Sequence, residues 1–415
     1  MYSRLAKVQT GSFSTVYRAY DTERGQEVAL KIIEKPADAE LARKLTRLVG
    51  SERDILRALG TQHPNVCAML DFYERETCYV FVMEYAARGD LYDVIRGWRK
   101  GGAAGREQVD LARIVVQLCS AIQYAHVRGI AHRDIKPENV LLDSAGNVKL
   151  ADWGLSCRAR VSQDTRIGTE KYLAPEAYSC AHDTFLADFW SLGVTLLFVM
   201  FGACPFKNAC LTKTPNNPNF AHFLANPHRF ISEYYFRPLH ERGAGTKGSP
   251  QLRRDSVGVE GPAEWLALPQ ALLPTERERL LLLCATCVVT CLLVINPRAR
   301  SMQEFLLRMA SLLPRGESKS HAVPQQQQQR QSPDKLDTDF FYSGLVTDPD
   351  AVASIYGAGS CSGSSTSDAA TSSDLAESTG SEQSSQSAQS TQSLPSAPSA
   401  RPAQPAKILS EELEL

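Results

Sequence analysis

The chain has 415 residues, of which 43% are hydrophobic, and 45 Lys and Arg against 46 Asp and Glu give a formal net charge of −1. Such a chain can hold a two-lobed domain of roughly 250 to 300 residues and an appendage. Because the balanced charge produces no overall attraction to polyanions, we expect neither nucleic acid nor a membrane surface as a partner.

The N-terminus and the cysteines bear on the cellular compartment. Residues 1–8 contain no apolar signal-peptide core. The eleven cysteines are scattered through apolar runs and loops, and their number is odd, unlike a disulfide framework. We therefore expect reduced thiols and a cytoplasmic or nuclear location.

The first hundred residues contain strand-like runs and one long amphipathic pattern. Strand-like alternation at 5–8 and 16–19 flanks a segment with one glycine, Gly11. A further run ends in Val-Ala-Leu-Lys at residue 31, and a helical pattern over 39–59 contains Glu52. Taken alone, the segment around Gly11 also fits a plain hairpin turn, and Glu52 also fits a solvated charge on an amphipathic helix.

An apolar run at 79–85 has the length of a buried strand and breaks at residues 86–90, Ala-Ala-Arg-Gly-Asp. Apolar residues at helical spacing over 111–126, ending near Gly129, predict a buried helix. This helix leads directly into the most informative segment of the chain.

Residues 132–139 read His-Arg-Asp-Ile-Lys-Pro-Glu-Asn, and residues 152–154 read Asp-Trp-Gly. Asp152 and Asn139 offer the hard oxygen ligands that Mg²⁺ prefers, and Asp134 offers a base for a hydroxyl proton. The alternative is an ordinary turn between strands, since Asp, Asn and Pro are common there. One short triplet would not decide between them, but the complete string at this interval favours phosphoryl transfer.

These motifs resemble those of the eukaryotic serine/threonine protein kinases, and the resemblance covers about residues 2–313. It implies an α+β, bilobal fold with a small β-rich N-terminal lobe and a larger helical C-terminal lobe. The implied activity transfers the γ-phosphate of ATP to Ser or Thr of protein substrates in intracellular signalling. Asp134 would be the base, Lys136 would neutralise the phosphoryl group, and Asn139 and Asp152 would bind Mg²⁺.

The resemblance also implies a set of nucleotide-binding residues. The family's Gly-rich loop corresponds to residues 9–16, where only the middle glycine is kept. Lys31 would bind the α- and β-phosphates and pair with Glu52. The remaining contacts would come from Gln9, Gly11 and Ser14 in the loop, Val16 and Ala29 above the adenine, Leu141 below it, the backbone of Glu84 and Ala86 beside the gatekeeper Met83, and Asp90 at the ribose.

The segment from residue 152 to 176 corresponds to the family's activation segment. Trp153 replaces the usual Phe and adds a ring N–H to an internal stack with Leu56, Met69 and His132. By resemblance, Thr169 contacts Asp134, and a phosphate on Thr165 would bind Arg133. A solvated loop threonine is the alternative for Thr165. Two further correspondences are structural: Asp188 would anchor the catalytic loop, and Arg300 would pair with Glu176.

The chain is longer than the family pattern at about residues 207–270, which we interpret as an insert. Its residues 220–231 have helical periodicity up to Pro227, and the sequence Asn-Pro-His-Arg-Phe there resembles a fungal subgroup of nutrient- and meiosis-signalling kinases. Residues 252–257, Leu-Arg-Arg-Asp-Ser-Val, resemble a site for cAMP-dependent protein kinase, which would make Ser256 the target of an upstream kinase. A solvated basic loop is the alternative.

The last third of the chain contains an apolar run and a polar tail. Residues 280–295 are apolar but shorter than a typical membrane span, so we expect a buried helix and no membrane span, with Cys284, Cys287 and Cys291 in the core. Residues 314–415 are rich in Gln and Ser and are predicted to be disordered. The competing hypothesis for the whole protein is an inactive, pseudokinase scaffold, which Gln9 and Ser14 favour and the filled catalytic positions oppose.

Overall fold

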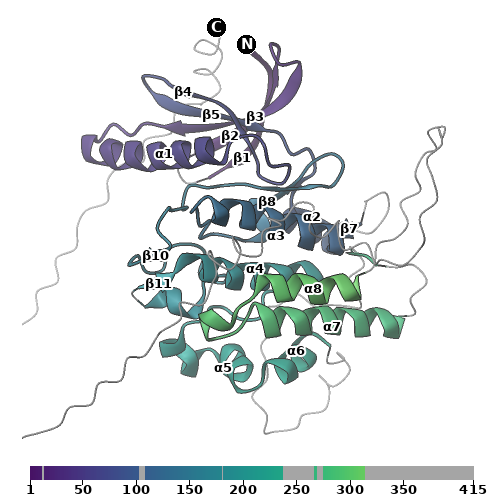
Figure 1. Ribbon diagram of the computed structural model, residues 1–415. Helices are drawn as coiled ribbons and strands as arrows, with labels where there is room; N and C mark the ends of the chain where they lie inside the picture. Colours follow the sequence, from purple (N-terminus) through teal and green to yellow (C-terminus); the bar gives the residue numbers. More distant parts are fainter. Residues whose placement is uncertain (12–13, 102–107, 180, 237–265, 269–273, 314–415) are drawn as a thin grey trace, which may run out of the picture.

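The computed structural model describes residues 1–11, 14–101, 108–179, 181–236, 266–268 and 274–313. A sheet with one helix forms the smaller part, and most of the helices form the larger part below it (Figure 1). The predicted bilobal α+β fold is therefore confirmed. The predicted tail, residues 314–415, and residues 237–265 and 269–270 of the predicted insert lie outside the described residues.

The smaller lobe is built on a five-stranded antiparallel sheet in the order β1-β2-β3-β5-β4. Side chains alternate between the two faces of a strand. In β3, Leu30 and Ile32 therefore join an apolar cluster on one face, whereas Ile33 packs with α1 on the other. Lys31 shares the α1 side. The strands are β1 (Tyr2–Thr10), β2 (Ser14–Asp21), β3 (Gln26–Glu34), β4 (Met69–Glu74) and β5 (Cys78–Glu84).

Helix α1 (Ala39–Leu59) has the bounds that the periodicity predicts. Asp38 caps its start, accepting hydrogen bonds from the backbone N–H groups of Glu40 and Leu41 at 3.0 and 2.8 Å. Gly60 ends it with a positive φ of 66°. The buried stripe of this helix contains one charged residue, Glu52, which is 7% exposed. A buried carboxylate is costly unless a positive charge or a hydrogen-bond donor lies close to it.

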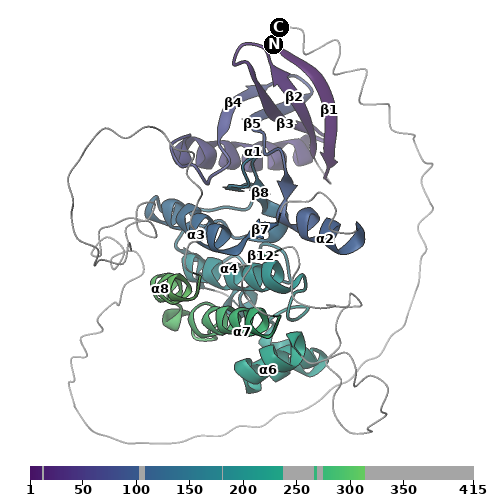
Figure 2. The same ribbon diagram turned by 90° about the vertical axis from the view of Figure 1, so that its right-hand side faces the viewer.

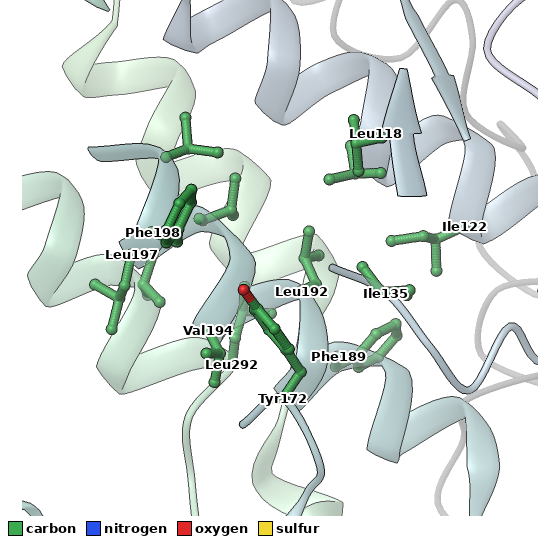
Figure 3. Close-up of a cluster of buried hydrophobic side chains, with 14 of the residues drawn as sticks. Leu118, Ile122, Ile135, Tyr172, Phe189, Leu192, Val194, Leu197, Phe198 and Leu292 are labelled. Carbon is green, nitrogen blue, oxygen red and sulfur yellow. The ribbon is translucent and has the colours of Figure 1, made fainter. Parts of the chain in front are cut away.

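The larger lobe is organised around α4 (Thr184–Phe201). Figure 2 shows α3, α4 and α7 stacked below one another, and Figure 3 shows apolar side chains of α4 meeting Leu118 and Ile122 of α3 and Leu292. The other helices are α2 (Leu91–Gly101), α3 (Leu111–Val127), α5 (Pro218–Ala225), α6 (Pro227–Tyr235), α7 (Pro274–Cys291) and α8 (Met302–Leu312).

Short paired strands flank the loops of the larger lobe. β6 (Gly89–Asp90), β8 (Val140–Leu142) and β9 (Val148–Leu150) form one small sheet. Two-residue pairs join β7 (Val109–Asp110) to β12 (Leu266–Ala267) and β10 (Val161–Ser162) to β11 (His182–Asp183). The loop between α3 and β8 carries the His-Arg-Asp motif, so it is fixed at both ends by ordered elements.

Two helices bear on the membrane question. Among the described helices, α4 is long and apolar enough to cross a membrane, yet 94% of its apolar window is buried inside the protein, as in a core helix. The run at 280–295 falls largely on α7, as expected for a buried helix. Cys284, Cys287 and Cys291 are buried there with free thiols.

The described part of the insert is helical further than predicted. The periodicity extended only to Pro227, but α6 begins at that residue and continues to Tyr235. Proline is favourable in the first turn of a helix, and Asn226 caps α6 by accepting a hydrogen bond from the Arg229 N–H at 2.9 Å. Buried Phe223 and Phe230 pack at the α4 side of this region, where Phe223 contacts Trp190 edge-on. The insert is therefore partly core.

Candidate active site

The catalytic loop is held from below by Asp188 of α4. Its carboxylate accepts hydrogen bonds from the backbone N–H groups of His132 and Arg133, both at 2.8 Å, and contacts the His126 ring at 2.8 Å. Arg133 has a positive φ of 66°. A non-glycine residue in this conformation is strained, and surrounding contacts must hold it. The predicted anchoring role of Asp188 is thus confirmed by its geometry.

Three donor groups converge on Asp134, whose side chain is 6% exposed. Lys136 Nζ lies 2.6 Å from Oδ2 and also donates to the Thr169 hydroxyl at 2.8 Å. The Thr169 N–H donates to Oδ1 at 2.9 Å, and Asn139 Nδ2 donates to the backbone oxygen of Asp134 at 2.8 Å and to Oδ2 at 3.1 Å. These bonds fix the carboxylate in one orientation.

Lys31 joins the two lobes. Its Nζ lies 2.7 Å from Glu52 Oε1 of α1 and 3.1 Å from Asp152 Oδ1. Burial alone would lower the Lys31 pKa, but the two neighbouring carboxylates outweigh it and the pKa is raised. Burial likewise opposes the charge on Asp152, yet the Lys31 charge and hydrogen bond hold the Asp152 pKa below its usual value. Lys31 and Asp152 are therefore charged at neutral pH.

The donor set around Asp152 and Asn139 fits Mg²⁺. No cluster of three or more His, Cys, Asp or Glu that could hold a metal occurs among the described residues. Magnesium usually takes one or two protein carboxylates together with substrate phosphates, so such a cluster is not required. The Asp152 side chain is 53% exposed, and the Asn139 amide nitrogen is committed to Asp134, which leaves the Asn139 oxygen as the ligand atom.

Trp153 follows Asp152 and is 1% exposed. Its ring lies 4.5 Å from that of His132, and it belongs to the same core cluster as Leu56, with Met69 packed against it. The indole N–H donates a hydrogen bond to the Leu150 carbonyl at 3.3 Å. A phenylalanine, the usual residue of the resembled motif, has no such donor. The larger ring therefore adds a polar contact that fixes this segment.

Replacement of this ring tests that contact. We expect Trp153→Phe to lower the free energy of unfolding by about 1 to 3 kcal/mol, because it removes both buried ring atoms and a hydrogen bond. Denaturant unfolding measures the change. Trp190→Phe is the matched control, because the Trp190 ring is also buried but its N–H has no hydrogen-bond partner among the described residues. An equal loss in both variants would contradict a contribution from the Trp153 hydrogen bond.

The residues expected around the adenine lie together at the junction of the lobes. Ala29 of β3 pairs with Met83 of β5, and both are only partly buried, as are Val16 and Leu141. Apolar side chains at strand centres are normally core residues. Their partial exposure here is what a nucleotide-binding surface requires.

The hinge residues have contacts that the motifs did not predict. Glu84 forms an ion pair with Lys149 of β9 at 3.0 Å, which ties the hinge to the larger lobe. Asp90 accepts a hydrogen bond from the Asp93 N–H at 2.8 Å, so one of its oxygens caps α2. Ala86 accepts from the Gly89 N–H at 3.2 Å through its carbonyl. Asp90 thus has a structural role, and its ribose contact stays a prediction.

The predicted phosphate loop is only partly described. Gln9 pairs with Val16 across the β1 and β2 strands, and the Gly11 N–H donates to the Ser14 carbonyl at 2.7 Å. A Cβ added at Gly11 would lie 3.4 Å from the Ser14 hydroxyl. The hairpin is therefore tight at this point. Residues 12 and 13 at its tip lie outside the described residues.

Arg133 has a contact in the activation segment that the sequence did not predict. Its Nη1 lies 2.8 Å from Asp164, and the adjacent Thr165 is exposed. Binding of a phosphate on Thr165 to this arginine stays a prediction. The two other predicted contacts are present: Thr169 meets Asp134, and Arg300 meets Glu176 at 2.5 and 2.9 Å. The predicted regulatory residue Ser256 lies outside the described residues.

Comparison with known proteins agrees with this geometry. The sequence model of the protein kinase domain family matches residues 2–227. The chain belongs to the protein kinase family. This kinase is 37% identical over 330 residues to the probable serine/threonine-protein kinase FMP48 of Saccharomyces cerevisiae, which covers 74% of this chain and 85% of that protein.

Plant kinases are also similar to this kinase over a shorter stretch. CBL-interacting protein kinase 32 of Oryza sativa is 36% identical over 224 residues, 52% of this chain and 49% of that protein. CBL-interacting serine/threonine-protein kinase 19 of Arabidopsis thaliana is 37% identical over 205 residues, 48% of this chain and 40% of that protein. The kinase thus spans about half the length of these plant relatives or less.

Proposed function

We propose that this protein kinase transfers the γ-phosphate of ATP to Ser or Thr hydroxyls of protein substrates. The observation that carries the proposal is the position of Asp134, whose carboxylate contacts Lys136 and the Thr169 N–H. The names of the similar kinases support the same acceptor residues. In this role the carboxylate accepts the proton of the substrate hydroxyl as the hydroxyl oxygen bonds to the γ-phosphorus, while the bond from this phosphorus to the β–γ bridging oxygen breaks and ADP leaves.

The other site residues stabilise charge and position. Lys136, held between Asp134 and Thr169, would place its positive charge beside the transferred phosphoryl group. Lys31, fixed by Glu52, would hold the α- and β-phosphates, and Asp152 and Asn139 would hold Mg²⁺. ATP with Mg²⁺ supplies the phosphoryl group and neutralises part of its charge. We propose the nucleotide contacts of Gln9, Gly11, Ser14, Val16, Ala29, Glu84, Ala86, Asp90 and Leu141 as the resemblance implies them.

For the substrate, we propose a preference for a positive side chain upstream of the acceptor residue. Burial raises the pKa of Glu138, and nearby Asp90 and Asp134 contribute. One Glu138 oxygen is buried without a hydrogen-bond partner among the described residues. Burial also raises the Asp90 pKa, with Asp93 contributing. A cationic substrate group would relieve both the repulsion and the missing hydrogen bond.

The decisive experiment measures phosphate transfer from ATP with Mg²⁺ to a positional peptide library that contains Ser, Thr or Tyr acceptors. We expect labelling of Ser and Thr peptides, strongest with Arg or Lys upstream, and almost none with Lys31→Met. Lys35→Met is the matched control, because Lys35 pairs with exposed Glu74 at 2.9 Å, away from Asp152. Transfer by Lys31→Met at the rate of Lys35→Met would refute the assigned role. No transfer by the unaltered kinase would favour the scaffold hypothesis.

We further propose a kinase domain over residues 1–313, with an insert at about 207–270, followed by a tail over 314–415 that lies outside the described residues. The last described helix, α8, supports this boundary because it ends at Leu312. A cytoplasmic or nuclear location is proposed because the buried free thiols of Cys67, Cys119 and Cys284 suit a reducing compartment. Phosphorylation of Ser256 by an upstream kinase stays a prediction.

A further inference from the structure

Arg133 joins three segments that are distant in the sequence. Its backbone N–H is held by Asp188, its Nε donates to the Leu155 carbonyl at 2.6 Å, and its Nη1 pairs with Asp164 at 2.8 Å. The Arg133 side chain is only 14% exposed. A cation so enclosed needs an anion close by, because burial disfavours an isolated charge.

The activation segment itself supplies this anion. Asp164 is oriented by its own N–H, which donates to the Ser162 hydroxyl at 3.1 Å. Ser162 belongs to β10, which pairs with β11. The hydrogen bond from Arg133 holds the Asp164 pKa below its usual value, so the carboxylate is charged at neutral pH.

The same segment is fixed against the catalytic loop after Asp164 as well. The Arg166 N–H donates to the Ala177 carbonyl at 2.8 Å. A Cβ at Gly168 would lie 2.4 Å from the Arg133 carbonyl oxygen, so only glycine fits this approach. Gly168 immediately precedes Thr169, the residue that contacts both Asp134 and Lys136. The position of the activation segment therefore determines how Thr169 contacts Asp134, the proposed base.

We infer that Asp164 takes the place of a phosphate on Thr165, so that the Arg133–Asp164 ion pair holds the activation segment in position in the unphosphorylated kinase. This inference rests on the proposed function. Asp164 is a positioning residue, because it contacts Arg133 and not the reacting atoms. A phosphate on Thr165 then meets an arginine that is already neutralised.

The test compares variants of the full chain, treated with phosphatase and checked for residual phosphate by mass spectrometry. We expect Asp164→Asn to lower kcat/KM for a Ser peptide by about 3- to 10-fold, since a charge-assisted but partly exposed hydrogen bond is lost. Asp164→Glu should regain most of the activity. Thr165→Ala, altered at the adjacent exposed residue, should match the dephosphorylated kinase within about twofold.

A double variant separates positioning from general loss of structure. Arg133→Met should lower kcat/KM, and adding Asp164→Asn should lower it little further, because the two residues act through one contact. Additive losses, or full activity of Asp164→Asn, would overturn the inference. The inference would also be overturned if Thr165→Ala were inactive while the phosphorylated, unaltered kinase is active. If the untreated kinase labels no substrate at all, the proposed function fails instead.

Discussion

Asp134→Asn is expected to reduce phosphate transfer by about 100- to 10,000-fold, the usual contribution of a general base. Asparagine keeps the shape of the side chain, but its single amide oxygen can accept only one of two hydrogen bonds, from Lys136 to Oδ2 or from the Thr169 N–H to Oδ1. It cannot accept the substrate proton. The loss should therefore appear mainly in kcat, with KM for peptide changed little. Steady-state kinetics with a Ser peptide measure both.

A surface variant shows whether loss of any negative charge has this effect. Glu304→Gln on α8 removes an exposed carboxylate that pairs with Arg308, far from the motif in the sequence. It should retain the activity of the unaltered kinase. Asp134→Asn should still show a cooperative unfolding transition, with the free energy of unfolding lowered by about 1 to 3 kcal/mol because one side-chain acceptor is lost. Comparable kcat in the two variants would exclude Asp134 as the base.

The largest effect on stability is expected at Arg300. Its side chain is 0% exposed, and it donates to both oxygens of Glu176 and to the backbone carbonyls of Val294 and Leu186. Arg300→Met would leave the Glu176 carboxylate and two carbonyls without this donor. Breaking a buried pair at one partner costs about 3 to 5 kcal/mol. Chemical denaturation of the purified kinase measures this loss.

Arg298→Met is the matched control for Arg300→Met. Arg298 is in the same short turn but is exposed to solvent. Its loss should change the free energy of unfolding by less than about 0.5 kcal/mol, as at most surface sites. If the two variants were equally stable, the Glu176 pair would contribute no more than a surface charge does.

The sequence alone indicated that the candidate catalytic residues lie close together, because they occur in one short string. Asp134, Lys136 and Asn139 are within six positions of each other, so the motif fixes their relation before the fold is known. Helix α1 was equally predictable, since its cap, its apolar period and its final glycine are all local signals. The long-range contacts of Lys31, Asp188 and Arg300 followed from the resemblance to a family.

The contacts that sequence reasoning missed are pairs of ordinary charges far apart in the chain. Asp164 and Arg133 are separated by 31 positions, and Lys149 and Glu84 by 65. Neither Asp164 nor Lys149 is distinguished by spacing or composition from a solvated residue. Only packing reveals such partners. The one available signal was the adjacency of Asp164 to Thr165, which placed an acid where a phosphate was expected.

The Trp153 hydrogen bond bears on which inhibitors suit this kinase. A compound that binds only after Asp152 and Trp153 turn out of their observed positions must break the bond to Leu150 and withdraw a ring that is 1% exposed. Its apparent affinity is reduced by the small fraction of kinase molecules that adopt the rearranged state. A compound that occupies the proposed adenine site, to which we assign Ala29 and Leu141, needs no such change. Selective inhibitors of this kinase are therefore better sought among compounds that accept the observed arrangement.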